Sequence, residues 1–116
     1  MRTVVELPEF QSRAKYLLGD SERHSIVAHL ATHPEAGSIL KGTGGIRKLR
    51  WAAKGKGKSG GVRVVYFCQD RTMPLFLLTM FAKGEKTNLS RKERNELARV
   101  VALLAKNYGT VNERDI

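Results

Sequence analysis

The spacing of apolar and polar residues predicts a strand and two helices in the first third of the chain. The β-branched segment at 3–7 predicts a strand. Apolar residues recur at helical spacing over 8–18, beginning with Pro8, a residue that suits the first turn of a helix. Gly19 interrupts this pattern, and a second apolar helical face follows and ends before Pro34. Two consecutive helices are therefore expected after the first strand.

In the middle of the chain the spacing changes to the period of two that is typical of strands. Residues 34–45 are expected to form a linker that ends in the tight turn GTGG. Lys48 and Arg50 fall on one face of the following strand, and Leu49 and Trp51 fall on the other, which we expect to face the core. The expected strands are 46–53, 62–68 and 74–82. Their short connections predict antiparallel neighbours.

The last third of the chain predicts one amphipathic helix. Ser90 and Glu93 have the spacing of a capping box, and Gly109 is expected to end the helix. The expected apolar stripe consists of Leu97, Val100, Val101, Leu104 and Tyr108. The order of elements predicts a single α+β domain over 1–116, with two N-terminal helices and a C-terminal helix packed on an antiparallel sheet.

Charge is distributed unevenly along this framework. The chain has 21 Lys and Arg against 11 Asp and Glu, a formal net charge of +10. The segment 36–69 contains no acidic residue but holds eight basic ones: Lys41, Arg47, Lys48, Arg50, Lys54, Lys56, Lys58 and Arg63. Such a patch predicts a polyanionic or acidic partner. The alternative is a hairpin whose charge only keeps the protein soluble.

The remaining composition points to a protein of a reducing compartment. Cys68 is the only cysteine, so an intramolecular disulfide is excluded, and its place on an alternating strand predicts a core residue. Residues 1–20 lack the pattern of a signal peptide, and the most apolar stretch, 74–82, is too short to span a bilayer. We therefore expect a cytoplasmic protein without a membrane partner.

Three motifs do not predict ligand sites. The GKS segment at 57–59 resembles the end of a phosphate-binding loop, but Ala52 stands where that motif needs a glycine, and a strand follows instead of a helix. The GTGG turn also precedes a strand, which argues against a dinucleotide site. His29 and His33 are one helical turn apart, but two ligands are too few for a typical zinc site. We expect neither a metal nor a cofactor.

Two segments carry a resemblance to a known family. GTGGIRKLRWAAKGKGKSGGVRVVYF at 42–67, followed by LLTMFAKGEKTNLS at 77–90 and a helix, resembles the RelE/ParE superfamily of type II toxins, and most closely its HigB-like branch. The similarity covers nearly the whole chain in the order of elements. It implies a microbial-RNase-like fold, in which helices flank a central antiparallel sheet.

The resemblance also implies an activity and partners. Most RelE-like toxins are mRNA interferases, which are metal-independent endoribonucleases that enter the ribosomal A site and cut the message there. A cognate antitoxin neutralises the toxin, and here it is expected to be a helix-turn-helix protein similar to HigA. The expected partners are therefore this antitoxin, the ribosome and mRNA, with operator DNA contacted only through the antitoxin.

The family pattern implies roles for individual residues. Lys54 and Lys56 match the loop lysines, one as general base and one as electrostatic support, in an order that the sequence leaves open. Arg63 matches a strand arginine that holds the scissile phosphate, although a structural pairing with Glu85 is the alternative. Lys83 is expected to be a second phosphate ligand or the general acid. The expected RNA contacts are Arg47, Lys48, Arg50, Lys58 and Lys86.

One departure from the family leaves the general acid open. RelE has an active-site tyrosine near its end, whereas the corresponding segment, 87–91, has none, and Tyr108 is expected to be in the core. Three other functions stay open, one of which is a degenerate toxin that keeps only its contact with the antitoxin. A ParE-like inhibitor of DNA gyrase would share the fold without the nuclease residues. A non-catalytic nucleic-acid-binding module would present outward aromatic residues, here mainly Trp51, Tyr66 and Phe67.

Overall fold

The computed structural model describes residues 2–52, 61–70, 72–86 and 88–114, with side chains as far as residue 107. In chain order its elements are β1 (Val4–Glu6), α1 (Pro8–Leu17), α2 (Asp20–Thr32), β2 (Ser38–Ile39), β3 (Ile46–Trp51), β4 (Val62–Phe67), β5 (Leu75–Ala82) and α3 (Arg91–Arg114). The α+β class and the expected order of two N-terminal helices and one C-terminal helix are confirmed.

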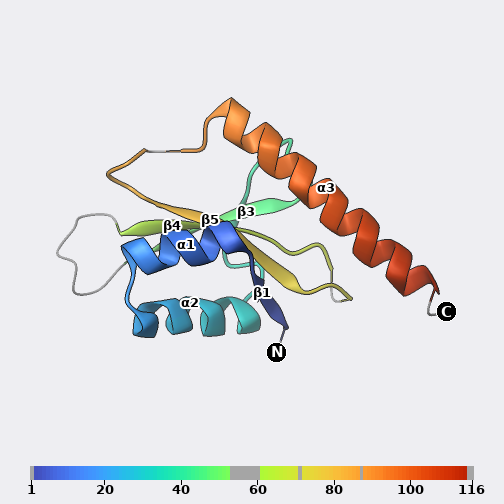
Figure 1. The fold of residues 1–116 in the computed structure, drawn as a ribbon, viewed down its shortest axis with the longest axis horizontal. Helices are drawn as coiled ribbons and strands as arrows, with labels where there is room; N and C mark the ends of the chain where they lie inside the picture. Colours follow the sequence, from blue (N-terminus) through green and yellow to red (C-terminus); the bar gives the residue numbers. More distant parts are fainter. Residues whose placement is uncertain (1, 53–60, 71, 87, 115–116) are drawn as a thin grey trace.

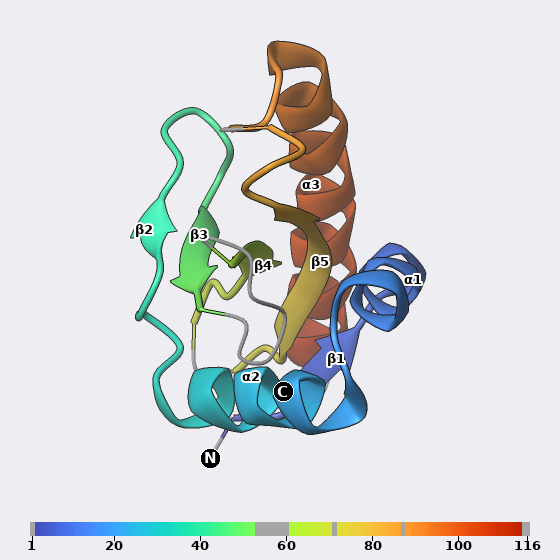
Figure 2. The ribbon, with the colours of Figure 1, turned by 90° about the vertical axis from the view of Figure 1, so that its left-hand side faces the viewer.

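The strands form one mixed sheet with the order β1-β5-β4-β3-β2. The expected antiparallel meander is confirmed, because β3 pairs with β4 and β4 pairs with β5 in antiparallel fashion. Figure 2 shows β2, β3, β4 and β5 following one another across the molecule. A shift in register between Val65 and Tyr66 interrupts the ladder between β4 and β5.

Helices cover the two faces of this sheet and bury two separate clusters of apolar side chains. Figure 1 shows α1 and α2 on one side of the sheet and α3 on the other. Phe10, Ile26 and Leu30 pack against one face, whereas Leu97 and Val101 of α3 pack against the other. Alternation along β4 divides its side chains between the clusters, with Val62, Val64 and Tyr66 on the first face and Val65 and Phe67 on the second.

Three local features differ from the sequence-based expectations. The segment 34–45 contains the two-residue strand β2, which pairs with β3. The first strand pairs in parallel with β5, at the edge of the sheet. The prediction that Gly109 ends the last helix is wrong, because α3 continues to Arg114. Glycine costs only about 1 kcal/mol relative to alanine inside a helix, so it weakens a helix without necessarily ending it.

The apolar stripe of α3 is also narrower than expected. Val101 is 3% exposed, whereas Val100 is 38% exposed and lies on the outer side of the helix. Within the residues that the structure describes, no helix is long and apolar enough to cross a membrane.

Tyr66 anchors the chain that leads from α2 to β2. Its ring is fully buried, and its hydroxyl donates to the carbonyl of Pro34 at 2.9 Å and accepts from the backbone amide of Gly37 at 2.8 Å. A Cβ atom at Gly37 would lie 2.9 Å from the carbonyl oxygen of Lys48, so only glycine fits this close approach. Burial raises the pKa of the Tyr66 hydroxyl. Tyr66 is therefore a structural residue and not an outward-facing aromatic.

Replacement of Tyr66 by phenylalanine should destabilise the fold. The buried amide of Gly37 and the carbonyl of Pro34 would each lose a partner, so the free energy of unfolding should fall by about 1–3 kcal/mol, as measured by urea denaturation. The matched control is Tyr16→Phe at an exposed position, which should change the free energy of unfolding by less than about 0.5 kcal/mol. An unchanged denaturation midpoint for Tyr66→Phe would contradict this role.

Candidate functional site

Two arginines lie opposite each other on neighbouring strands. The register pairs Arg50 at the end of β3 with Arg63 at the start of β4, so their side chains leave the sheet on the same face. Arg63 is only 8% exposed, whereas Arg50 is exposed. Like charges directly opposite in a sheet repel each other. An anion bound between two guanidinium groups would offset this repulsion through charge-assisted hydrogen bonds.

Lys48 adds a third cation to this face. It pairs with Val65, two residues along β3 from Arg50, and therefore points to the same side of the sheet. Its Nζ donates to Oδ1 of Asn88 at 3.2 Å. Asn88 lies in the connection between β5 and α3, so this hydrogen bond links the basic face to the start of the last helix. We call Lys48, Arg50 and Arg63 the sheet cations.

Phe81 on β5 extends the pair of Arg50 and Arg63 into a row of three residues across three strands. It pairs with Arg63 in the register between β4 and β5 and is 2% exposed. The ammonium group of Lys86 lies 5.2 Å from the centroid of its ring, within the range of a cation–π contact. The row therefore runs from Arg50 through Arg63 to Phe81, with Lys86 beside it.

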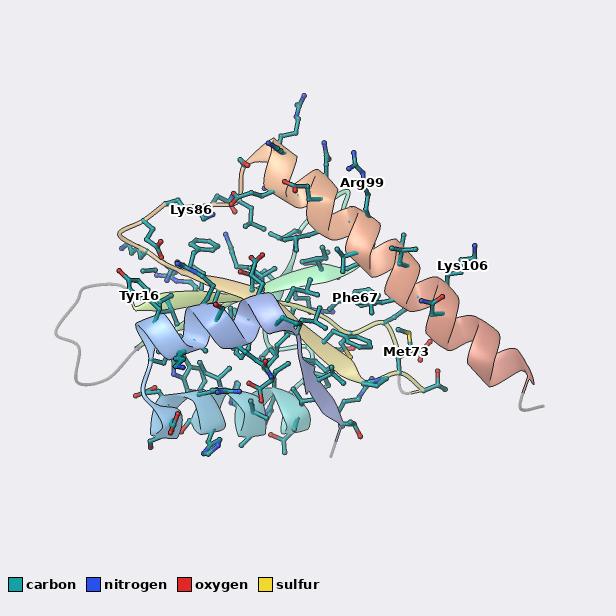
Figure 3. All side chains as sticks on the ribbon, in the orientation of Figure 1. Tyr16, Phe67, Met73, Lys86, Arg99 and Lys106 are labelled. Atoms are coloured by element: carbon teal, nitrogen blue, oxygen red, sulfur yellow. The ribbon has the colours of Figure 1, made fainter. Side chains whose placement is uncertain are left out.

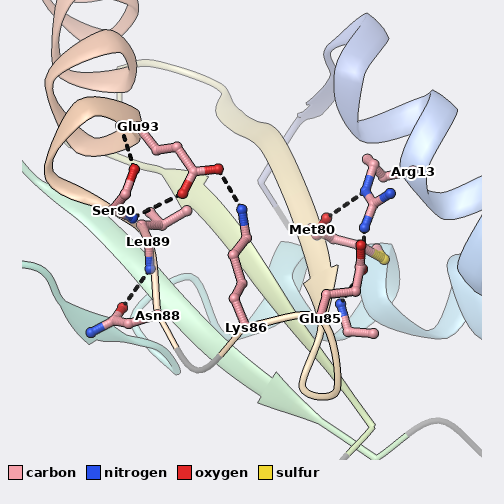
Figure 4. A network of polar contacts seen from close by, with 9 residues as sticks. Arg13, Met80, Glu85, Lys86, Asn88, Leu89, Ser90 and Glu93 are labelled. Carbon is pink, nitrogen blue, oxygen red and sulfur yellow. Dashed lines mark hydrogen bonds and ion pairs between the residues drawn. The ribbon is translucent and has the colours of Figure 1, made fainter.

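The capping box of α3 fixes the position of Lys86 (Figure 4). The backbone amide of Ser90 donates to Oε1 of Glu93 at 2.8 Å, and the amide of Glu93 donates to Oγ of Ser90 at 3.1 Å, which confirms the predicted box. The second carboxylate oxygen of Glu93 forms an ion pair with Lys86. The hydrogen bond from Lys86 and then the bond from the Ser90 amide hold the pKa of Glu93 below its ordinary value.

Glu85 forms polar contacts on the opposite side of the turn between β5 and α3 (Figure 4). Its Oε1 accepts from the backbone amide of Ala82 at 2.9 Å and forms an ion pair with Arg13 of α1. The Ala82 amide, followed by the charge of Arg13, lowers the pKa of Glu85. Nε of Arg13 also donates to the carbonyl of Met80 at 3.0 Å, so these side chains satisfy backbone groups at the edge of β5 that β1 does not reach.

Lys83 lies in this turn with an exposed side chain. Its backbone amide donates to the carbonyl of Gly61 at 3.2 Å. Gly61 directly precedes β4, so Lys83 is held next to the strand that carries Arg63. The structure thus brings Lys83 to the same end of the sheet as the two paired arginines.

Arg47 lies on the other face of the sheet. Its guanidinium donates to the carbonyl of Gly37 at 2.7 Å and of Glu35 at 3.4 Å, in the loop before β2. Alternation along β3 separates it from Lys48 and Arg50. Arg47 is thus placed apart from the sheet cations. Lys54, Lys56 and Lys58 lie outside the described residues.

The aromatic residues of the sheet are not presented to a ligand. Phe67 is fully buried, like Tyr66. The indole of Trp51 packs against the cluster under α1 and α2 and donates to Oε2 of Glu22 at 2.9 Å, in agreement with its predicted core-facing position. The described sheet therefore lacks the outward aromatic platform that a purely stacking RNA-binding surface uses.

The described side chains with metal-binding potential do not form a cluster. The rings of His29 and His33 stack with centroids 4.9 Å apart. Among the described residues, no group of three or more His, Cys, Asp or Glu side chains is arranged to hold a metal. Cys68 is half-buried, and burial raises the pKa of its thiol, which favours the less reactive protonated form.

Two residues of this region are not predicted from the sequence. Asn88 and Arg13 carry no motif, and their roles depend on contacts with residues 40 and 72 positions away along the chain. The spacing of Ser90 and Glu93 predicts the capping box, but it does not predict the ion pair of Glu93 with Lys86. Lys86, predicted as an RNA contact, is an ion-pair partner in the described structure.

The lowered pKa of Glu93 predicts a pH dependence of stability. A carboxyl with a depressed pKa in the folded state stabilises the fold above its unfolded pKa, and this contribution is lost as the pH falls through the folded pKa. The difference in unfolding free energy between wild type and Glu93→Gln should therefore be present at about pH 7 and shrink towards about pH 3. Urea denaturation at several pH values measures it. Glu96→Gln is the control, and a difference that is constant with pH would contradict the assignment.

Comparison with known proteins shows the family of the chain. The sequence matches the family described as the RelE toxin of the RelE/RelB toxin–antitoxin system over residues 10–116. A solved structure of a mutant of the E. coli toxin RelE in the free state superimposes with a TM-score of 0.53 and 18% sequence identity, covering 74% of this chain and 87% of that chain. This likeness confirms the RelE-like fold. The chain belongs to the RelE toxin family.

Proposed function

We propose that residues 1–116 form a single toxin domain of the HigB-like branch, and that it is a ribosome-dependent mRNA endoribonuclease. The observation that carries this proposal is the pairing of Arg50 with the largely buried Arg63 on one face of the sheet. Family membership supports the toxin assignment. The arrangement favours an enzyme that binds a phosphate at a fixed place, because two forked cations leave neighbouring strands on the same face.

The proposed reaction needs no group beyond the side chains of the protein and the RNA. The ribose 2′-oxygen attacks the adjacent phosphorus, a new P–O bond forms, and the bond to the 5′-oxygen of the next nucleotide breaks. The products are a 2′,3′-cyclic phosphate and a 5′-hydroxyl. One group must accept the 2′ proton, another must donate a proton to the leaving oxygen, and cations must stabilise the phosphorane.

The sheet cations are suited to the electrostatic part of this reaction. Arg63, held by its strand, and Arg50 would bind the non-bridging oxygens, and Lys83 is a second phosphate ligand or the general acid. Lys54 and Lys56 supply the base and its support, since clustered lysines lower one another's affinity for protons. Lys58 and Lys48 would contact neighbouring phosphates, and Lys86 would do so after release from Glu93. Arg47 remains a predicted RNA contact on the basis of charge alone.

The proposed partners follow from the proposed reaction. The ribosome and its message are the substrate complex, and an acidic antitoxin similar to HigA is the inhibitor, through which operator DNA is contacted. The proposed location is the cytoplasm, where translating ribosomes are found.

Induction of the chain in bacteria tests the activity directly. Primer extension on a translated message, and on the same message without its start codon, should show cleavage only in the first. Arg63→Lys keeps the charge but removes the bidentate fork, and should reduce the rate of cleavage by about 10²-fold or more. Lys54→Ala combined with Lys56→Ala should reduce it by at least a similar factor. Circular dichroism verifies that these variants fold.

The control is Lys106→Ala, which removes an exposed cation of α3 away from the site and should leave cleavage unchanged. Growth arrest without cleavage of either message would contradict the nuclease and favour inhibition of gyrase, which supercoiling assays would then reveal. RNA binding without cleavage or growth arrest would instead favour a non-catalytic module.

A further inference from the structure

Asn88 lies over the same face of the sheet as the sheet cations. It belongs to the connection between β5 and α3, and its side-chain oxygen Oδ1 accepts a hydrogen bond from Nζ of Lys48 at 3.2 Å. The next residue, Leu89, is 7% exposed and packs in the apolar cluster between α3 and the sheet. Figure 4 shows the two residues just before the start of α3. A buried neighbour therefore holds this polar side chain beside the cations.

Two donors determine the orientation of the Asn88 amide. The backbone amide of Leu89 donates to the same Oδ1 atom at 2.9 Å. An ammonium group and a backbone N–H can only donate, so both require the oxygen of the side-chain amide and not its nitrogen. The oxygen is thus occupied. Within the described part of the chain, the NH₂ group of Asn88 makes no hydrogen bond.

The distances along the sheet bring this NH₂ group within reach of a bound nucleotide. Lys48 and Arg50 are two residues apart on β3, a separation of about 7 Å along the strand. Arg50 lies opposite Arg63 on β4. A nucleotide whose phosphate is bound by the two arginines spans such a distance, so its own base or the next one can contact Asn88.

A group that only donates distinguishes the bases by their exocyclic groups. At the ring position furthest from the sugar, uracil and guanine carry a carbonyl oxygen, which accepts, whereas cytosine and adenine carry an amino group, which donates. Asparagine usually binds adenine through its oxygen and its nitrogen together, but the oxygen of Asn88 is occupied. The remaining NH₂ group therefore matches a carbonyl oxygen and opposes an amino group.

We propose that Asn88 is a base-reading residue that selects uracil or guanine in the RNA bound on the sheet cations. This inference rests on the proposed function and deepens it, because it assigns a base preference to that same site. The preference does not depend on the contact with Lys48. When the lysine turns towards a phosphate, the Leu89 amide still holds Oδ1 and keeps the NH₂ group available to the base.

Binding of short uncleavable RNA tests this preference without a ribosome. Hexanucleotides of 2′-O-methyluridine and of 2′-O-methylcytidine differ in the exocyclic group, and fluorescence anisotropy at low salt measures their affinities. Wild type should bind the uridine hexamer about 2- to 10-fold more tightly. Asn88→Ala should bring this ratio to about one, because the donor is removed. Asn88→Asp presents an acceptor in place of the NH₂ group and should invert the ratio, while its charge weakens both complexes.

The matched control is Asn95→Asp, which adds the same charge at an exposed residue of α3. Asn95 lies one helical turn before Arg99, whose side chain points away from the sheet (Figure 3). This variant should keep the uridine preference of wild type. Circular dichroism verifies that all variants fold.

Cleavage of a translated message is recorded in parallel, so the two proposals fail separately. The base-reading role is overturned if wild type binds neither hexamer, binds both equally or prefers cytidine, or if Asn88→Ala keeps the uridine preference, even where the message is cut. A uridine preference that is lost in Asn88→Ala and inverted in Asn88→Asp supports the role even where no message is cut, and in that case the nuclease proposal is the one that fails.

Discussion

The pairing of Arg50 with Arg63 across neighbouring strands is the constraint around which the candidate site is organised. The antiparallel register of β3 and β4 sets the two residues opposite each other, and the packing of β4 holds Arg63 at 8% exposure. Like charges directly opposite in a sheet are unfavourable for folding, and Nη1 of Arg63 donates to the carbonyl of Val62 at 3.4 Å. The two faces of the sheet, each with its own apolar cluster, supply the stability that keeps the charges in place. Two arginines that leave neighbouring strands on one face are suited to bind an anion at a defined point.

The capping box of α3 stabilises the start of the helix and also positions a side chain of the candidate site. Ser90 and Glu93 begin the helix, and the same carboxylate holds Lys86 beside Phe81. On the other side of the turn, Arg13 and Glu85 satisfy backbone groups at the edge of β5. The turn between β5 and α3, which carries Lys83, is thus fixed by two ion pairs. Phosphates are proposed to bind the sheet cations.

Much of the fold could be predicted from the sequence because its signals are local. Alternation gave the three central strands, and the spacing of Ser90 and Glu93 gave the start of α3. The parallel pairing of β1 with β5 and the two-residue strand β2 depend on contacts between distant segments, which periodicity does not report. The predicted helix end at Gly109 is wrong because the helix propensity of one residue has a small effect compared with the cooperativity of a long helix. At the site, alternation predicts that Lys48 and Arg50 share a face, but the positions of Arg13 and Asn88 depend on the tertiary structure.

The most direct test of the central claim is the stability of Arg50→Gln, measured by urea denaturation at low salt beside its cleavage rate. If the two arginines are held against their mutual repulsion in order to bind phosphate, the substitution should raise the free energy of unfolding while it slows cleavage. Added salt should narrow the difference in stability, because it screens the charges. A loss of stability together with unchanged cleavage would contradict the account, since Arg50 would then be a structural residue and not part of a phosphate site.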